Sequence, residues 1–256
     1  MKEEKNIALI FAGGTGSRMG ANLPKQFLKI YGKEIIIHTL EKFQYNNNID
    51  LIYVGCIDNY ITLLEELVQK YHITKIPLGG IIPGGTTGQD TIYKLLKKAR
   101  EDNPENSICL IHDGVRPLIT NKVINDNIES VKKYGSSITA TKAFETPIIS
   151  LDGTHIDKVL ARNTVYTAQA PQSFRLDDIL EAHKKIRSTK DGYNNPKIVD
   201  SCSLMMECGN NVHLIEGNRG NIKVTTVEDY INLLGNLSIK DQEQIFKLIN
   251  KEKNYE

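Results

Sequence analysis

The stretch Ile7-Ala-Leu-Ile-Phe-Ala-Gly-Gly-Thr-Gly-Ser-Arg-Met-Gly-Ala-Asn-Leu-Pro-Lys25 is the most informative part of this 256-residue chain. Its apolar start predicts a buried strand, and glycines allow the tight turns and close ligand approach that follow. The strand runs into three of them, Gly13, Gly14 and Gly16. Two cations, Arg18 and Lys25, lie in the same stretch. A strand that opens into a glycine-rich loop beside positive charge is typical of a phosphate-binding site.

The overall composition indicates which partners to expect. Charged residues make up 25% of the chain and leave a formal net charge of +1, which gives no sign of a nucleic-acid or membrane surface. No apolar stretch is long enough to span a bilayer, and the first residues do not resemble a signal peptide. The four cysteines, none at C-x-x-C spacing, predict neither a disulfide framework nor structural zinc. We therefore expect a cytoplasmic protein.

Strand-like and helix-like segments alternate along the chain. Strands are expected at 7–11, 51–57, 75–78, 108–111, 137–141 and 212–216. Within residues 26–43, a short turn at Gly32 is expected to precede a helix through Thr39–Leu40. Further helices are expected at 60–71, 89–100, 121–134, 176–187, 200–208, 227–235 and 239–253. This alternation predicts an α/β fold, with a Rossmann-like, doubly wound, mostly parallel sheet between two helical layers. We expect a single domain over residues 1–256.

Residues 142–170 depart from this pattern. Two apolar segments, Ile148–Leu151 and Ile156–Leu160, flank an Asp152–Gly153 turn, which is typical of a β-hairpin. A hairpin has no place in a doubly wound sheet, so we predict a β-arm that protrudes from the main domain. Because such an arm needs a surface to pack on, we expect a homodimer.

The expected sheet also predicts where a ligand binds. In doubly wound sheets the ligand crevice lies beyond the carboxyl ends of the strands. The glycine loop and the segment His112-Asp-Gly-Val-Arg-Pro117 each follow a strand directly. We therefore expect both segments to meet at that crevice.

Three kinds of phosphate loop are compatible with a strand followed by glycines. A P-loop is excluded, because no lysine follows a glycine in the required frame. Gly14, Gly16 and Gly20 are spaced one residue too widely for a dinucleotide-binding motif. Tyr93 and Lys97 match a dehydrogenase pair, but this i,i+4 spacing is common on helices. The remaining interpretation is a nucleoside-triphosphate loop whose cations hold the phosphates.

Five blocks of sequence, in the same order, resemble the polyol-phosphate cytidylyltransferases. This family includes 2-C-methyl-D-erythritol 4-phosphate cytidylyltransferase, of isoprenoid synthesis, and D-ribitol-5-phosphate cytidylyltransferase. The blocks are Ala12–Gly20 with Leu23–Phe27, Gly84–Thr86, His112–Pro117, Arg162 with Gln169–Phe174, and Gly220–Thr226. The resemblance implies a nucleotidyltransferase that moves CMP from CTP to a polyol phosphate and releases pyrophosphate. The opening Phe11-Ala-Gly-Gly favours the ribitol branch, with D-ribitol 5-phosphate converted to CDP-ribitol.

The implied reaction needs charge neutralisation more than proton transfer. The nucleophile is a phosphate oxygen that is already ionised at neutral pH, so catalysis consists of positioning and electrostatic stabilisation. By the resemblance, Arg18 and Lys25 hold the triphosphate, and Lys223 stabilises the α-phosphate. Mg²⁺ would be held mainly by the CTP phosphates, and the sequence predicts no metal-ligating side chains.

The resemblance also assigns binding residues. The nucleotide would contact Ala12, Gly13, Gly14, Thr15, Gly16, Gly84, Gly85 and Thr91. Asp113 matches an aspartate near the ribose and the acceptor hydroxyls, whereas Arg116 is equally compatible with catalysis and with a structural salt bridge. Thr146 and Arg162, on the arm, would contact the acceptor phosphate in the neighbouring subunit, because Arg binds phosphate in a bidentate manner.

Three positions depart from the family pattern, and two of them, Ala170 and Val199, leave the acceptor open. Gly88 stands where the family usually has Arg, and Ala170 and Val199 stand where it usually has Thr. Two other classes of protein fit the sequence less well. A glycosyltransferase would need an Asp-x-Asp metal motif, of which the 112–114 segment supplies one acid. A non-catalytic nucleotide-binding protein would not need the cations at positions 18, 25 and 223.

Overall fold

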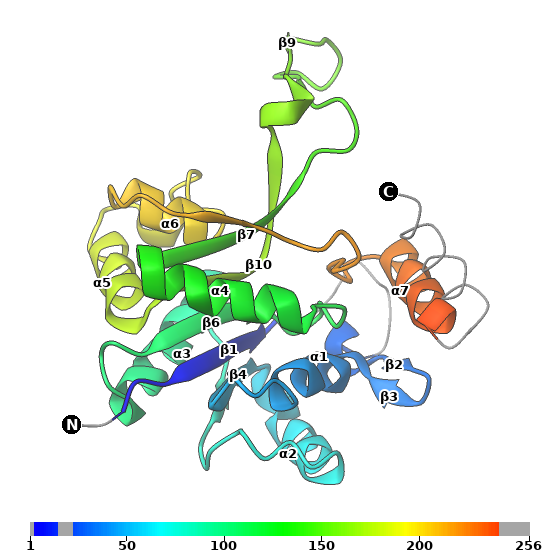
Figure 1. The fold of residues 1–256 in the computed structure, drawn as a ribbon, viewed down its shortest axis with the longest axis vertical. Helices are drawn as coiled ribbons and strands as arrows, with labels where there is room; N and C mark the ends of the chain where they lie inside the picture. Colours follow the sequence, from blue (N-terminus) through cyan, green and yellow to red (C-terminus); the bar gives the residue numbers. More distant parts are fainter. Residues whose placement is uncertain (1–2, 15–22, 241–256) are drawn as a thin grey trace.

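A seven-stranded mixed sheet forms the centre of the computed structural model, which describes residues 3–14 and 23–240 (Figure 1). The strand order is β11-β7-β10-β6-β1-β4-β5. Their bounds are β1 Asn6–Ala12, β4 Leu51–Cys56, β5 Ile81–Pro83, β6 Ile108–Asp113, β7 Ser136–Lys142, β10 Tyr166–Arg175 and β11 Leu214–Glu216. Strand β10 pairs antiparallel with β6 and β7, whereas the other pairings in this sheet are parallel. The predicted mostly parallel α/β sheet is confirmed.

Helices cover both faces of the sheet, as predicted. One face carries α1 (Ile35–Gln44), α2 (Ile61–Lys70) and α4 (Asn121–Tyr134). The other carries α3 (Gly88–Asp102), α5 (Leu176–Arg187) and α6 (Ser201–Glu207). Successive side chains of a strand point to opposite faces, so β1 supplies Ala8 and Ile10 to one core and Ile7 and Leu9 to the other. Complete burial of each large apolar side chain contributes about 2 kcal/mol, which holds the strand ends in place.

A smaller apolar cluster fixes the segment that leads into the last helix. Helix α7 (Val227–Lys240) packs beside the hairpin of β2 (Lys29–Ile30) and β3 (Lys33–Glu34). Val224 and Leu233 are completely buried in this cluster. Because Val224 is anchored there, its neighbour Lys223 is held close to the sheet. The predicted helix 239–253 lies outside the described residues from position 241 onward.

Two strand predictions need correction. The predicted strand 75–78 is wrong: these residues form turns, and the edge strand β5 begins at Ile81. Pro77 and Gly79, which has a φ of 71°, interrupt the extended backbone, and Leu78 is fully exposed. Strand β10 was not predicted, because Pro171 and neighbouring polar residues give this segment a composition that is typical of a loop. Its register with β7 shifts between Ala168 and Gln172.

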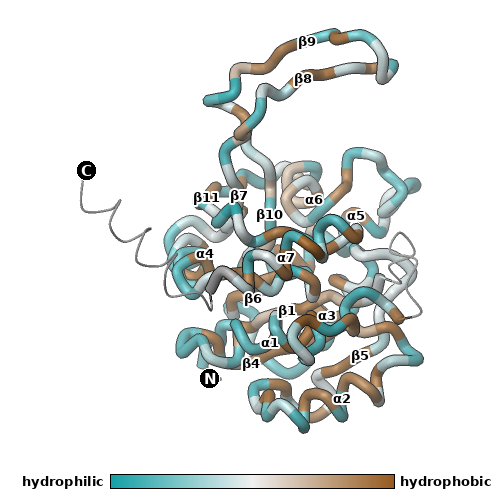
Figure 2. The backbone as a smooth tube through the Cα atoms, turned by 90° about the vertical axis from the view of Figure 1, so that its right-hand side faces the viewer, coloured by the Kyte–Doolittle hydropathy of each residue, from teal (hydrophilic) through white to brown (hydrophobic). Residues whose placement is uncertain are grey.

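The predicted arm is present as a long excursion between β7 and β10 (Figures 1 and 2). At its tip β8 (Ile148–Ile149) pairs antiparallel with β9 (Lys158–Val159), so the hairpin is confirmed with shorter strands than expected. Its exposed apolar side chains are Phe144, Ile148, Ile149, Leu151, Ile156 and Val159. All four cysteines are free, in agreement with the expected lack of disulfides.

Candidate active site

Two adjoining cavities lie beyond the carboxyl ends of β1 and β6. The smaller, of about 200 Å³, is lined by the backbone of Ala12 to Gly14 and by Gly85, and we call it the glycine half. The larger, of about 430 Å³, is lined by residues from several loops, and we call it the loop half. Both are lined by Phe11, Thr87, Gly88, Asp113 and Lys223, which form the shared wall. The predicted meeting of the glycine loop with the 112–117 segment is confirmed.

Backbone hydrogen bonds shape the glycine half. The Gly84 N–H donates to the Cys56 carbonyl at 2.6 Å, which continues the sheet edge into the loop. The Gly85 N–H donates to Thr91 Oγ1 at 2.8 Å, and this hydroxyl donates to the Thr87 carbonyl at 3.0 Å. A Cβ on Gly13 would lie 3.1 Å from the same hydroxyl and would have to displace it by a few tenths of an ångström, so this close approach favours glycine. Thr91 therefore fixes residues 85–87 of the loop against α3 while it lines the cavity.

The predicted cation Lys25 lies beside this half. It begins the short helix η2 (Lys25–Phe27), is half-buried and lines the glycine half. The buried side chain of Gln26 donates to the Ala12 carbonyl at 2.7 Å, which ties η2 to the end of β1. Sequence reasoning did not single out Gln26, although it lies in a quoted block. Three other predicted residues, Thr15, Gly16 and Arg18, lie outside the described residues.

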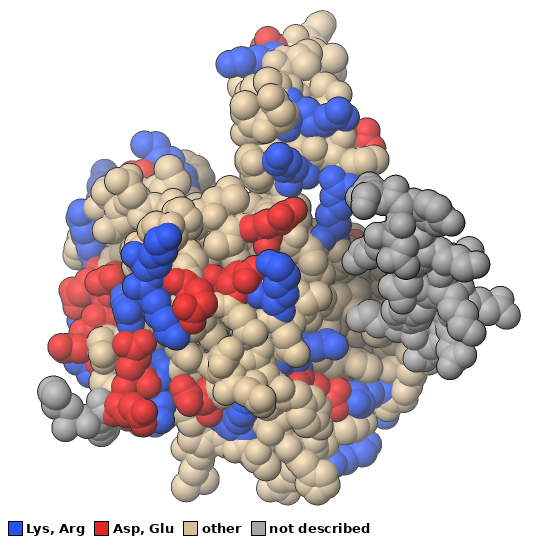
Figure 3. Space-filling model, in the orientation of Figure 1, with Lys and Arg blue, Asp and Glu red and all other residues tan. Residues whose placement is uncertain are grey.

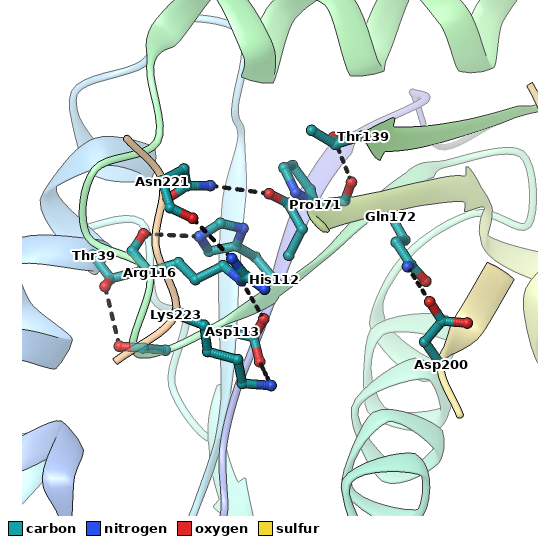
Figure 4. Close-up of polar contacts among 12 residues, drawn as sticks. Thr39, His112, Asp113, Arg116, Thr139, Pro171, Gln172, Asp200, Asn221 and Lys223 are labelled. Carbon is teal, nitrogen blue, oxygen red and sulfur yellow. Dashed lines mark hydrogen bonds and ion pairs between the residues drawn. The ribbon is translucent and has the colours of Figure 1, made fainter. Parts of the chain in front are cut away.

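Asp113 is the charged centre of the shared wall (Figure 4). Its carboxylate contacts Lys223 Nζ at 2.5 Å through Oδ1 and Arg116 Nε at 2.7 Å through Oδ2. Burial by itself would raise the pKa of Asp113, but the charges and hydrogen bonds of the two cations prevail and lower it. The carboxylate is therefore ionised at neutral pH, and two cations with one carboxylate leave the wall positively charged.

Arg116 ties together the two segments that supply Asp113 and Lys223. Its Nη1 donates to the Asn221 carbonyl at 2.8 Å, while its own carbonyl lies 3.1 Å from His112 Nε2. Burial lowers the pKa of His112 to about 4, so its ring is neutral at pH 7 and donates one proton to this contact. Of the two roles left open for Arg116, the geometry supports the structural salt bridge.

Outside the shared charges, uncharged residues also line the loop half. Gly88, Ala170 and Val199, the three departures from the family pattern, all line it. The loop half is also lined by the polar side chains of Gln172 and Asp200, and Gln172 Nε2 donates a hydrogen bond to Asp200 Oδ2 at 2.7 Å. The N-cap Asp200 also accepts from the Ser203 N–H, so its carboxylate is fixed by α6.

The two predicted arm residues do not line the cleft of their own chain. Thr146 is exposed, and Arg162 lines a separate cavity of about 350 Å³ at the base of the arm. Lys142 and Arg219 line the same cavity, and Figure 3 shows basic side chains on the arm and at its base. Within one chain, the structure therefore separates these residues from the other predicted site residues.

Within 3–14 and 23–240, no three His, Cys, Asp or Glu side chains gather so as to hold a metal ion. In that part of the chain, no helix has the length and apolarity needed to cross a membrane.

Comparison with known proteins identifies the family. The family model described as 2-C-methyl-D-erythritol 4-phosphate cytidylyltransferase matches residues 6–233. The chain belongs to this cytidylyltransferase family. The chain is 44% identical, over 94% of its length and 99% of the relative, to a ribitol-5-phosphate cytidylyltransferase of Vibrio parahaemolyticus. It is 37% identical, over 88% of its length and 93% of the relative, to a 2-C-methyl-D-erythritol 4-phosphate cytidylyltransferase of Clostridium novyi.

A solved structure supports membership in the same family. The 4-diphosphocytidyl-2C-methyl-D-erythritol synthase of Anaerococcus prevotii superposes with a TM-score of 0.79 at 26% identity, covering 92% of this chain and 96% of that one. Membership in the cytidylyltransferase family confirms the predicted nucleotidyltransferase class. The roles of the individual site residues remain predictions, now with a geometry that can be tested.

Proposed function

We propose that this enzyme transfers CMP from CTP to D-ribitol 5-phosphate and releases pyrophosphate. The higher identity to a ribitol-5-phosphate cytidylyltransferase, 44% against 37% for the methylerythritol relative, supports this acceptor over the alternative. The two-part cleft supports a reaction between two substrates, since two adjoining cavities meet at the shared wall.

The proposed chemistry follows from the shared wall. An acceptor phosphate oxygen forms a bond to the α-phosphorus of CTP, and the bond from that phosphorus to the bridging oxygen breaks as pyrophosphate leaves. No proton is removed from the nucleophile, so the main barrier is repulsion between two anions. Lys25 and Lys223 would reduce this repulsion from the glycine half and from the shared wall. When Lys223 turns to phosphate, Arg116 still pairs with Asp113.

We propose that the nucleotide arrives with Mg²⁺ bound mainly to its phosphates. The cleft fits this arrangement, because the shared carboxylate of Asp113 already contacts Lys223 and Arg116. When bound, the ion would neutralise phosphate charge. The chain's own contribution is to hold the triphosphate with Lys25 and with the backbone of Gly13, Gly14 and Gly85.

We propose a homodimer in which each arm completes the partner's cleft. The exposed apolar side chains of the arm support a protein partner. The position of Arg162, outside its own cleft, supports a contact with acceptor phosphate in the other subunit. The balanced net charge and the free cysteines support a cytoplasmic enzyme that acts on small molecules, with no nucleic-acid or membrane partner.

A panel of acceptors tests the reaction. The purified chain is supplied with CTP, Mg²⁺ and either D-ribitol 5-phosphate or 2-C-methyl-D-erythritol 4-phosphate, and pyrophosphate release is measured. We expect kcat/KM for ribitol 5-phosphate to be at least about 10-fold higher, a difference of about 1.4 kcal/mol. Preference for the methylerythritol acceptor would transfer the assignment to the alternative, and turnover with neither would reject both.

A mixed dimer tests the shared site. Lys25→Ala and Arg162→Ala chains are co-expressed with different tags, and the heterodimer is purified. If the arm acts in the partner, one of its two sites has both side chains, so we expect about half the wild-type activity at low acceptor concentration. A heterodimer no more active than the average of the two single variants would show that Arg162 does not act across the interface.

A further inference from the structure

The loop half contains a tyrosine that neither its sequence pattern nor the family resemblance assigns. Tyr193 lies on the short helix η5 (Gly192–Asn194), within the polar loop between α5 and α6. It lines the loop half and does not line the glycine half. A residue that contacts one half of the cleft can distinguish between acceptors without affecting the nucleotide.

Helix α5 holds Tyr193 at two points. Its hydroxyl lies 2.5 Å from His183 Nδ1, and the two rings meet edge to face at 5.6 Å between centroids. The Arg187 guanidinium lies 5.5 Å from the centre of the Tyr193 ring and 4.4 Å from that of Tyr93. Arg187 is itself fixed by an ion pair with Asp90 at 2.8 Å. The hydroxyl end is therefore anchored to α5, and the ring is held as a rigid surface.

His183, which contacts the hydroxyl of Tyr193, is uncharged at neutral pH. His183 is completely buried, and burial lowers its pKa to about 3, with a smaller effect from the nearby charge of Arg187. A neutral imidazole carries one ring proton and therefore makes one directed contact with the tyrosine hydroxyl. This contact persists throughout the physiological pH range, so the position of the ring does not depend on pH there.

The uncharged residues of the loop half can distinguish between acceptors by shape. Gly88, Ala170 and Val199 line the same half, where Gly88 has no side chain and the side chains of the other two neither carry charge nor form hydrogen bonds. An apolar contact surface discriminates by about 10- to 200-fold for one methylene or methyl group. The carboxylates of Asp113 and Asp200 lie in the same half and can accept hydrogen bonds from acceptor hydroxyls.

We propose that Tyr193 is a specificity-determining residue for the acceptor. The ring offers a fixed apolar face on which the carbon chain of an unbranched polyol phosphate packs better than that of a methyl-branched one. This inference rests on the proposed function, because it takes the loop half to be the acceptor site. It predicts that selectivity depends on the ring, whereas CTP binding does not.

Substitutions of graded size test this role. Tyr193→Phe, Tyr193→Leu and Tyr193→Ala are assayed with CTP and either D-ribitol 5-phosphate or 2-C-methyl-D-erythritol 4-phosphate. We expect the ratio of the two kcat/KM values to fall about 10-fold in Tyr193→Ala and less in Tyr193→Leu. It should stay within about 3-fold in Tyr193→Phe, which retains the ring. KM for CTP should change by less than about 2-fold in all three.

A matched control separates selectivity from general damage. Tyr134 also stacks on a histidine, His213, at 3.8 Å, and lines neither half of the cleft, so Tyr134→Ala should leave the ratio unchanged. An unchanged ratio in folded, active Tyr193→Ala and Tyr193→Leu would overturn the inference while leaving the proposed function intact. Equal increases in the KM values of CTP and acceptor would overturn it as well. A wild-type enzyme inactive with both acceptors would reject the proposed function, and this inference with it.

Discussion

The glycine half and the loop half of the cleft are built by different means. The glycine half consists mainly of backbone at the ends of strands, and the Thr91 hydroxyl accepts a hydrogen bond from the Gly85 N–H. The loop half is formed largely by side chains from distant parts of the chain, among them Ala170, Tyr193 and Val199. A backbone-lined site tolerates few substitutions, because its shape follows from the sheet. A site lined by loop side chains can change with single substitutions, so a family can exchange acceptors while retaining its nucleotide.

The largest expected effect is in the glycine half. Replacement of Lys25 with Ala should lower kcat at least about 100-fold with any acceptor, because a positive charge beside the triphosphate is lost. The fold should remain intact, as circular dichroism can verify. Lys122→Ala is the matched control, since Lys122 lies exposed on α4 outside both halves. Near-normal pyrophosphate release by the Lys25 variant would contradict the proposed role.

An intermediate effect is expected from the arm, and it should be confined to the loop half. Arg162→Ala should raise KM for the acceptor about 10-fold and leave KM for CTP unchanged, because the guanidinium is proposed to bind only acceptor phosphate. Lys158→Ala, on the same arm, provides the control. Equal increases in both KM values would contradict the separation of the two halves.

Most of the glycine half could be predicted from the sequence, and much of the loop half could not. Gly13, Gly14 and Lys25 belong to one short continuous segment after a strand, so a local pattern reveals them. Tyr193 reaches the cleft only through contacts with α5, which no local pattern signals. Strand β10, which carries Ala170 into the cleft, was missed because its proline and polar residues resemble a loop.

The hydroxyl of Thr91 provides a smaller effect within the glycine half. Thr91→Val keeps the side-chain shape but loses the hydrogen bonds to the Gly85 N–H and the Thr87 carbonyl. Loss of such a pair should loosen the loop and raise KM for CTP about 5-fold. Thr91→Ser retains a hydroxyl and should remain close to wild type. If Thr91→Val raised KM for the acceptor instead, the assignment of the two halves would have to be exchanged.

The smallest expected effect is on stability, and it comes from the two buried histidines next to the cleft. His112 lies beneath the shared wall and His183 behind the loop half, and burial lowers both pKa values, to about 4 and about 3. Between these values and the unfolded value of about 6.5, the unfolded chain binds protons that the folded chain does not. The free energy of unfolding should therefore decrease as the pH falls below about 6.5.

His183→Gln isolates the contribution from the loop half. Between pH 7 and pH 6 each histidine should account for less than about 1 kcal/mol of the decrease, so the variant should show a shallower dependence on pH than wild type. Urea titrations at both pH values measure the difference. His155, exposed on the arm beside Asp152, gives a matched control, since its replacement with Gln removes no buried neutral imidazole. A steeper dependence in His183→Gln would mean that His183 is protonated in the folded enzyme, and the neutral anchor assigned to Tyr193 would then be wrong.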